Sequence, residues 1–410
     1  MQNSMAELGI VCNECDNVKK SNLLTIGIDA TNIRLGGGVT HLVEMLRALQ
    51  PANLCIKRVV VWGGKPILQA IDNRSWLDKL NPPAQDKGLI ERTLWQCYRL
   101  SQAARDEGCD VLFVPGGSYA GNFHPVVTMS QNLLPFEFHE LRRYGWTFIT
   151  LKLIVLRLTQ LSSFQQTDGL IFLTEYARDV VLEVTGKLRG QTCIVPHGLN
   201  LRFNMMPKLQ RDTSDYDDVH PYRVLYVSII DQYKHQWHVV EAISLLRKQG
   251  MPIALDLVGS AYPPSLKRLN ATIERLDVER NWVHYHGAIP FDELHHYYAQ
   301  ADIGLFASSC ENMPNILLET MAAGLPIACS RRGPMPEMLG EAGLYFNPEK
   351  PAEIATALRE LINSPELRTD LAQASYERAQ QYSWQRCADE TFKFLVEIAQ
   401  KKSGMTKKNV

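Results

Sequence analysis

Two successive stretches of alternating strand and helix patterns constrain the fold of this chain more than any other feature. The first stretch opens with residues 23–30, LLTIGIDA, and continues with VTHLVEMLRAL at 39–49, where apolar residues recur at helical spacing. Further strands are predicted at 58–64, 110–115, 125–130, 168–173 and 193–196, and further helices at 91–108 and 174–186. Short buried strands that alternate with helices are typical of a parallel, doubly wound sheet.

The same pattern starts again at residues 222–228, YRVLYVS. The segments that follow predict strands at 253–259, 281–287, 302–308 and 326–330, and helices at 235–250, 264–276 and 291–301. Residues 201–221, between the two stretches, are polar, acidic and bracketed by prolines, which favours a linker. We therefore expect an α/β protein with two Rossmann-like domains whose parallel sheets face a central cleft. The boundaries are an extension at 1–22, domains at 23–204 and 222–382, and a linker at 205–221.

Composition excludes several classes of protein. Charged residues make up 21% of the 410 residues and hydrophobic residues 45%, and the formal net charge is -1, as in ordinary soluble globular proteins. There is no basic excess that would indicate nucleic-acid binding. The nine cysteines are scattered and odd in number, and the first twenty residues do not have a secretory pattern, so we expect a reducing, cytoplasmic location. The single C-x-x-C, Cys12 and Cys15, is interpreted as part of a loose extension and not as a zinc site.

Residues 308–330, SSCENMPNILLETMAAGLPIACS, carry the strongest functional signal. Two carboxylates, Glu311 and Glu319, flank a predicted helix start, which Asn312 and Pro314 indicate. A helix N-terminus attracts anions, whereas a carboxylate beside it repels phosphate and suits a sugar hydroxyl. The pattern therefore indicates a ligand that carries both hydroxyl and phosphate groups.

Glutamates at this spacing also occur as solvated charges on helix surfaces. Here, however, Glu319 stands among Ile316, Leu317, Leu318 and Met321, and an unpaired carboxylate in apolar surroundings is costly. A functional role for Glu319 is therefore favoured over a solvated surface charge.

This stretch resembles the E-x(7)-E signature of family 4 of the retaining glycosyltransferases, which have the GT-B fold. The resemblance covers most of residues 23–400. It implies that Glu311 lies beside the donor sugar and that Glu319 binds the ribose hydroxyls. It also implies that a helix at 383–400 crosses back to the first domain, and we expect a frayed tail at 401–410. The backbone that would hold the diphosphate and the sugar belongs to Asn312, Met313, Pro314, Asn315, Ile316 and Leu317.

Other donor contacts are expected at strand ends. Gly36, Gly37 and Gly38 follow the first strand but do not match G-x-G-x-x-G, so they do not support a dinucleotide fingerprint. The resemblance places this glycine loop across the cleft from the diphosphate, and a tight turn is an equally good interpretation. In the second domain the resemblance implies donor contacts at Ser228, Gly259, Ala288 and Ile289, the last two by backbone contact with the nucleobase.

The resemblance assigns the second catalytic role to Lys234, which stands where the family has a lysine that stabilises the leaving phosphate. The family's arginine is replaced by Ile229, so that one cation and helix dipoles must suffice, or Arg331 or Arg332 reaches in. A surface lysine is the alternative for Lys234.

On the acceptor side, many relatives have a histidine near the reactive carbon, and this chain reads Ser130-Gln131-Asn132 there. Ser130 and Asn132 are the predicted acceptor contacts, by hydrogen bonding. They are expected at one rim of the first sheet together with Gly116, Gly117 and Thr174, because ligands bind at the carboxyl ends of parallel strands. His197 and His286 are interpreted as structural histidines.

Residues 138–164 are rich in apolar residues but too short and too charged to span a bilayer. The cluster of Arg142, Arg143, Lys152 and Arg157 beside Trp146 and Phe148 fits contact with an anionic membrane surface. A helix that packs on the sheet with its charged tips in water is an equally good interpretation.

The resemblance implies a retaining hexosyltransferase that moves a sugar from a nucleotide-diphosphate donor to a glycan or lipid-linked acceptor, in bacterial surface polysaccharide assembly. No metal ion or other cofactor is expected, and the D-x-D at Asp215 and Asp217 is interpreted as solvated charge in the linker. We expect the protein in the cytoplasm, with peripheral contact to the inner face of the membrane as an open question. The alternatives are a sugar-nucleotide epimerase of GT-B architecture and a degenerate partner subunit that binds nucleotide sugar without turnover.

Overall fold

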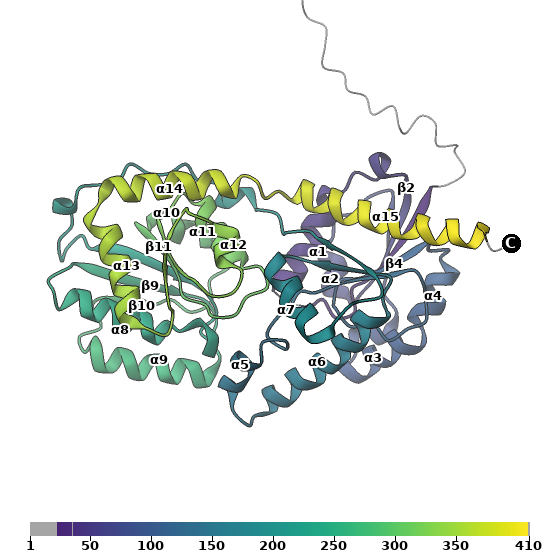
Figure 1. Ribbon diagram of the computed structural model, residues 1–410, viewed down its shortest axis with the longest axis horizontal. Helices are drawn as coiled ribbons and strands as arrows, with labels where there is room; N and C mark the ends of the chain where they lie inside the picture. Colours follow the sequence, from purple (N-terminus) through teal and green to yellow (C-terminus); the bar gives the residue numbers. More distant parts are fainter. Residues whose placement is uncertain (1–22, 35, 409–410) are drawn as a thin grey trace, which may run out of the picture.

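The computed structural model describes residues 23–34 and 36–408, with side chains up to residue 402. It contains two α/β domains that lie end to end (Figure 1). The extension at 1–22, with Cys12 and Cys15, lies outside the described residues.

The first domain is built on a seven-stranded sheet in which all paired strands are parallel. The strand order is β3-β2-β1-β4-β5-β6-β7, the doubly wound arrangement in which the chain reverses direction beside the first strand. Its strands are β1 (Leu24–Asp29), β2 (Ile56–Trp62), β3 (Leu77–Leu80), β4 (Val111–Val114), β5 (Val126–Met129), β6 (Gly169–Phe172) and β7 (Gln191–Ile194).

The first-domain helices cover both faces of this sheet, as the alternation predicts. One helix predicted at 91–108 is in fact two, because the helix breaks at Arg99, whose φ is -117°. No glycine or proline marks that break in the sequence. The helices are α1 (Gly37–Ala48), α2 (Lys65–Ala70), α3 (Leu89–Tyr98), α4 (Leu100–Asp106), α5 (Phe138–Leu141), α6 (Phe148–Gln166) and α7 (Glu175–Thr185), with 3-10 turns η1 (Pro51–Leu54), η2 (Pro83–Asp86) and η3 (Arg142–Tyr144).

The second domain has a six-stranded parallel sheet of order β10-β9-β8-β11-β12-β13. Its strands are β8 (Tyr222–Val227), β9 (Ile253–Val258), β10 (Val283–Tyr285), β11 (Ile303–Phe306), β12 (Ile327–Ser330) and β13 (Leu344–Phe346). Its helices are α8 (Gln236–Arg247), α9 (Pro263–Leu276), α10 (Leu294–Gln300), α11 (Asn315–Ala322), α12 (Met335–Leu339), α13 (Pro351–Asn363) and α14 (Pro365–Ala379), with η6 (Gln232–Lys234) before α8; η4 (Leu201–Phe203) and η5 (Thr213–Asp215) precede β8.

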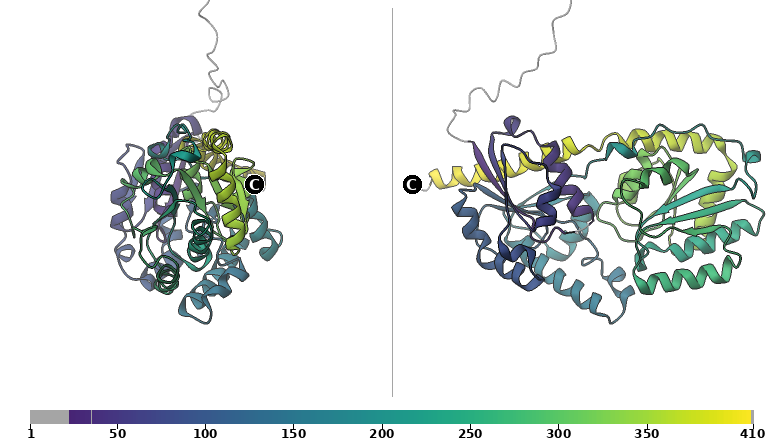
Figure 2. Two further views of the ribbon diagram at one scale, coloured as in Figure 1. Left: turned by 90° about the vertical axis from the view of Figure 1, so that its left-hand side faces the viewer. Right: turned by 180° about the vertical axis from the view of Figure 1, so that it is seen from behind.

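The last helix, α15 (Trp384–Lys408), leaves the second domain and packs against α1, β4 and η1 of the first (Figures 1 and 2). Phe392 and Leu395 on this helix are fully buried. The helix continues past residue 400, where the expected helix ended, through Lys408.

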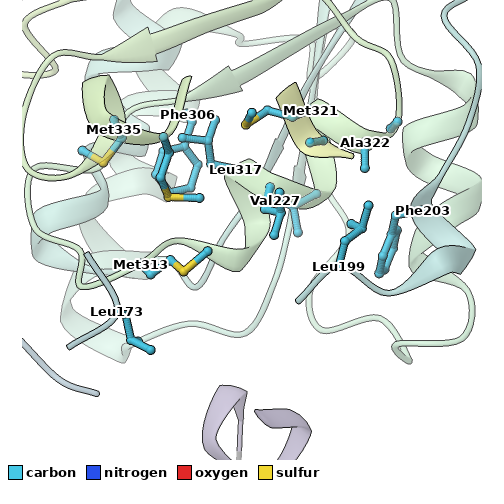
Figure 3. Close-up of a cluster of buried hydrophobic side chains, with 14 of the residues drawn as sticks. Leu173, Leu199, Phe203, Val227, Phe306, Met313, Leu317, Met321, Ala322 and Met335 are labelled. Carbon is cyan, nitrogen blue, oxygen red and sulfur yellow. The ribbon is translucent and has the colours of Figure 1, made fainter. Parts of the chain in front are cut away.

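A buried apolar cluster connects the two domains (Figure 3). Leu199 and Phe203, just after the first sheet, belong to the same cluster as Met313 and Leu317 in and before α11. Packing in this cluster therefore fixes the position of α11, the helix that carries Glu319. The N-terminal end of α11 faces the first domain.

Candidate functional site

Helix α11 forms as the sequence predicts, from Asn315 to Ala322, and it ends before Gly324, whose φ is +62°. Pro314 is the residue at its N-terminal boundary, and no side chain caps the helix. Asn312 does not act as the predicted cap, because its Nδ2 donates to the backbone oxygen of Ser130 in the first domain, 3.0 Å away. The free amides at this helix start are therefore directed toward the interface between the domains.

Lys234 and Glu311, the two predicted catalytic residues, form an ion pair in front of this helix. The Lys234 side chain is only 7% exposed, and its Nζ lies 5.0 Å from the Tyr233 ring centre and 5.3 Å from that of Phe306. A buried ammonium group requires an anion beside it, because desolvation of an unpaired charge is costly. The alternative of a solvated surface lysine is therefore wrong.

Glu319 is buried inside α11, and the Tyr298 hydroxyl donates to its Oε2 over 3.3 Å. Burial raises the pKa of Glu319 to about 8, an effect that the Tyr298 hydrogen bond and the charge of Arg202 offset only in part. Without a ligand, this carboxyl group is therefore largely protonated at neutral pH and can donate as well as accept a hydrogen bond.

The glycine loop lies against the start of α11. A Cβ atom added to Gly37 would be 3.7 Å from Nδ2 of Asn315, and one added to Gly38 would be 3.1 Å from Oε1 of Gln131. Gly36 has a φ of +70°, a conformation that other residues adopt only with strain. The loop thus has both a turn that requires glycine and backbone close to the predicted diphosphate position.

The carboxyl ends of β8, β9 and β10 lie side by side at one edge of the second sheet. A Cβ atom on Gly259 would lie 2.1 Å from the backbone oxygen of Ser228, so only glycine fits there, and the Gly259 amide donates to Gly287 over 2.8 Å. Ala288, just beyond, is exposed, whereas Ile289 is half-buried against the core. These residues form a continuous rim, and they are not in contact with the Lys234–Glu311 pair by any hydrogen bond.

Neither candidate for the missing arginine pairs with Glu311. Arg331 forms an ion pair with Glu353 at 2.8 Å, and Arg332 lies 3.9 Å from Glu349, both with half-exposed side chains. Ile229 is 40% exposed at the loop where the family's arginine would stand.

On the acceptor side, the structure separates the two predicted residues. Ser130 is completely buried behind Asn312, whereas Asn132 is exposed and lines a cavity of about 1040 Å³ at the carboxyl ends of the first-domain strands. Gly38, Gly116 and Gln131 line the same cavity.

Sequence reasoning missed a set of polar contacts between the domains. The Thr174 hydroxyl donates to the backbone oxygen of Asn312 over 2.9 Å, and the Ser309 hydroxyl donates to Glu140 over 2.7 Å. Glu337 of α12 accepts hydrogen bonds from the first two amides of α7, at 2.8 and 2.9 Å. Only the strand-end position of Thr174 could have signalled its contact, because the partners are more than a hundred residues apart.

His197 is a structural residue, as predicted, but with an unexpected partner. Its Nδ1 lies 2.9 Å from Nδ1 of His41 on α1, so one ring donates and the other accepts. Burial lowers the pKa of both, that of His41 to about 4. The His197 amide donates to the Met313 sulfur over 3.1 Å, which connects this pair to the loop before α11. His286 is bonded to Asp256 at 2.7 Å, away from the motif.

Within the described part of the chain, His, Cys, Asp and Glu side chains do not gather in threes that would suit a metal ion. Between residues 23 and 408, position 35 excepted, none of the helices has the length and apolar content needed to traverse a bilayer.

Part of this sequence is similar to known glycosyltransferases. Residues 221–364 match the family described as "Glycosyl transferases group 1", and this segment contains Lys234, Glu311 and Glu319. The O-antigen chain mannosyltransferase B of Escherichia coli is 24% identical over 230 residues, which are 56% of this chain and 58% of that protein. The matched region thus spans little more than half of that relative.

Among solved structures, sucrose-phosphate synthase from Thermosynechococcus elongatus superposes with a TM-score of 0.69 at 18% identity, over 90% of this chain and 97% of that one. Anabaena HepE in complex with UDP and glucose gives a TM-score of 0.66 at 15% identity, over 91% and 100%. Together with the two parallel sheets, these likenesses show that the chain has the GT-B fold, as predicted.

Proposed function

We propose that this GT-B chain is a retaining glycosyltransferase, which moves a hexosyl group from a nucleotide-diphosphate sugar to a glycan or lipid-linked acceptor during assembly of a bacterial surface polysaccharide. The group 1 family match and the O-antigen mannosyltransferase relative support this proposal. As part of this proposal, the protein acts in the cytoplasm and its reaction requires no metal ion. The binding of UDP and glucose by Anabaena HepE, which has the same fold, supports a nucleotide-sugar donor.

The observation that carries the proposal is the buried Lys234–Glu311 pair before the open end of α11. A departing nucleotide diphosphate gains negative charge, and a desolvated, fixed ammonium group stabilises such charge strongly. Before the donor binds, Glu311 neutralises Lys234. With the donor in place, the leaving phosphate shares the lysine, and Glu311 is left beside the sugar.

The remaining donor contacts follow from the same position. The free amides at the start of α11 donate hydrogen bonds to the diphosphate, since a helix N-terminus favours anions. Glu319, one to two turns further along, takes the ribose hydroxyls. The rim formed by Ser228, Gly259, Ala288 and Ile289 borders the nucleobase through its backbone groups.

The bond rearrangement uses these groups without a dedicated base. The acceptor hydroxyl attacks the anomeric carbon on the face from which the phosphate leaves, and its proton passes to a leaving phosphate oxygen. The C–O bond to the phosphate breaks as the new glycosidic bond forms, so the anomeric configuration is retained. Proton NMR of the first product distinguishes this outcome from inversion.

The decisive experiment measures acceptor-dependent nucleotide release. A thermal-shift screen with UDP, GDP, ADP and TDP identifies the base, because a ligand that binds the native state raises its melting temperature. The matching nucleotide sugars are then incubated with and without saccharide acceptors. Release that depends on acceptor supports transfer. Inversion at C2 or C4 of the donor supports an epimerase instead, and binding without turnover supports the degenerate subunit.

Peripheral membrane contact through residues 138–164 is part of the proposal, with a smaller set of basic residues than the sequence suggested. Arg143 is held by Glu140 and Glu349, and Arg157 donates to backbone oxygens of Pro135 and Phe136. Lys152 and Trp146 are exposed. Flotation with vesicles that contain or lack anionic lipid tests this contact, and equal recovery with both would argue against it.

A further inference from the structure

Helix α6 presents several apolar side chains outward. Phe148, Leu151, Val155 and Leu158 recur at helical spacing and are 52–79% exposed. The buried face of the same helix combines the apolar Leu153 and Phe164 with the polar Thr150, Gln160 and Ser163. A globular protein ordinarily buries such side chains, so this additional, exposed apolar stripe indicates that something apolar contacts the outer face.

Helix α3 has the same property and runs beside α6 (Figures 1 and 2). Leu89, Ile90, Leu94 and Tyr98 are each at least half exposed. The cavity of about 1040 Å³ lies between the two helices and is lined by Leu89 from one and by Val155 and Leu158 from the other. Its walls are thus continuous with the exposed apolar stripes.

The inner end of the cavity is polar and lies beside the candidate donor site. Asn132, Gln131 and Gly38 line it there, and the neighbouring Gly37 approaches Asn315 at the start of α11. Gln160, which is 3% exposed, also lines the cavity, and its Oε1 has no hydrogen-bond partner among the described residues. Burial of an amide oxygen without a hydrogen-bond partner is energetically costly. This indicates that a bound ligand donates a hydrogen bond to the Gln160 oxygen.

The charge of the lining selects among possible ligands. Lys152 is the one charged side chain that lines the cavity among the residues that the structure describes, and no carboxylate lines it. Lys152 is exposed and has no ion-pair partner in the described part of the chain. An anionic group is therefore tolerated in this cavity, whereas a cation would find no counter-charge.

We propose that the α3–α6 groove, defined by these lining residues, binds the hydrocarbon chain of a phosphate-linked lipid acceptor, with the saccharide at the amide-lined inner end. This inference rests on the proposed function and specifies its acceptor. The hydrocarbon chain of the lipid lies between Leu89, Val155 and Leu158. Lys152 pairs with the linking phosphate, and the Gln160 side-chain oxygen accepts a hydrogen bond from a sugar hydroxyl. The inner end of the groove then presents the reactive hydroxyl to the donor.

The first test measures the binding of alkyl phosphates of increasing chain length, from butyl to hexadecyl, each below its micelle-forming concentration, with inorganic phosphate as the zero-length reference. The affinity should rise up to about fourfold for each methylene group that enters the groove, and it should level off once the groove is full. An affinity that does not depend on chain length would overturn the proposal. So would one that rises without limit, because unspecific adsorption behaves in that way.

The location is tested by substitution and by labelling. Val155→Asn with Leu158→Asn should weaken dodecyl phosphate binding at least tenfold and leave UDP binding and the melting temperature unchanged. The control is Leu209→Asn with Val219→Asn in the linker, which replaces the same two residue types at more exposed positions and should change nothing. A dodecyl phosphate with a terminal diazirine should crosslink to peptides from 89–98 and 148–166. Labelling elsewhere, or equal losses in both double variants, contradicts the assignment.

The substitution Lys152→Gln distinguishes the contact with the phosphate from the contact with the hydrocarbon chain of the ligand. It should weaken dodecyl phosphate about tenfold and leave dodecyl β-maltoside unaffected, and equal effects on both would remove the phosphate from the proposal. These readouts do not depend on catalysis. If alkyl phosphates bind in the groove but no sugar is transferred, the proposed function fails and the lipid site remains. If sugar is transferred equally well to methyl and dodecyl acceptors and the probe does not label the groove, the groove proposal fails alone.

Discussion

At the scale of single residues, the buried Lys234 is the group on which the proposed chemistry depends most. Its ammonium is held between two aromatic rings and the Glu311 carboxylate, so it is already desolvated and oriented before any donor binds. Such preorganisation makes an electrostatic contribution larger than that of the same charge in water.

Replacing Lys234 with alanine should therefore lower the turnover number by roughly 10²-fold, as loss of one fixed charge stabiliser does. Steady-state nucleotide release with saturating donor measures it. Lys57→Ala, which removes an exposed lysine from β2, is the matched control and should keep the wild-type rate. A Lys234→Ala variant that turns over at nearly the wild-type rate would contradict the assigned role.

Glu319 leads to a prediction about pH and stability. Its pKa is raised to about 8 in the folded protein from an ordinary value of 4.5, so between these values the native state keeps a proton that the unfolded chain has lost. The native state then binds more protons, and stability falls as the pH rises through this window. Glu319→Gln lacks the titrating group, so its stability advantage over the wild type should grow by several kcal/mol between pH 4.5 and 8 and stay level above.

Denaturant unfolding of both proteins at several pH values measures this difference, with Glu377→Gln on the exposed face of α14 as the control. A constant difference across the range would mean that Glu319 is ionised in the native state. For function, Glu319→Ala should weaken donor nucleotide binding by roughly 0.5–1.5 kcal/mol, the usual net contribution of a hydrogen bond between uncharged groups, because the carboxyl group is largely protonated near neutral pH. Calorimetry that finds unchanged affinity would remove the ribose contact.

At the scale of elements, helix termini hold the two domains together. The N-terminus of α7 in the first domain has its own cap, the Thr174 hydroxyl, and in addition the Glu337 carboxylate from α12 in the second domain. A carboxylate at a helix N-terminus satisfies free amides and interacts favourably with the helix dipole.

Glu337→Ala should expose the first amides of α7 and cost about 0.5–1 kcal/mol of local stability. Hydrogen exchange measured by mass spectrometry should show faster exchange at residues 175–177, while Glu341→Ala, at an exposed position shortly after α12, should leave that exchange unchanged. Protection that persists at 175–177 would mean that the contact between α12 and α7 is not maintained in solution.

At the scale of the whole molecule, α15 fastens the second domain to the first. Its buried residues, among them Phe392 and Leu395, pack in the same continuous apolar cluster as the strands of both sheets. The polar contacts of Asn312 with Ser130 and Thr174 also join the two domains. Apolar packing of residues outside the candidate site therefore holds together the two domains that contribute the site residues.

Phe392→Ala should accordingly destabilise the protein by about 3–5 kcal/mol, because it leaves a cavity in a packed core. It should also raise the KM for donor more than the exposed substitution Lys393→Ala does, since the helix orients one domain against the other. Differential scanning calorimetry and steady-state kinetics measure both effects. A melting temperature equal to that of the wild type would show that α15 does not contribute to the cooperative core.

Whether a feature could be predicted from the sequence depends on how far apart along the chain its interacting residues lie. The strand and helix periods and the start and stop of α11 depend on neighbours along the chain, and they were predicted correctly. Edge strands β3 and β13 were missed, because LDKL and LYF are too short to show a period. The break at Arg99 was missed because no local residue requires it.

The sequence by itself determined the two parallel α/β domains, the helix that carries Glu319 and the identity of the residues before its N-terminus, Glu311 among them. These follow from local periodicity and from one spacing of residues. The tertiary structure alone decided that Lys234 is buried against Glu311, that Asn312 donates a hydrogen bond to Ser130 instead of capping its helix, and that α6 exposes an apolar stripe. Those outcomes depend on which distant segments meet and exclude water from one another, and no pattern within a single segment contains that information.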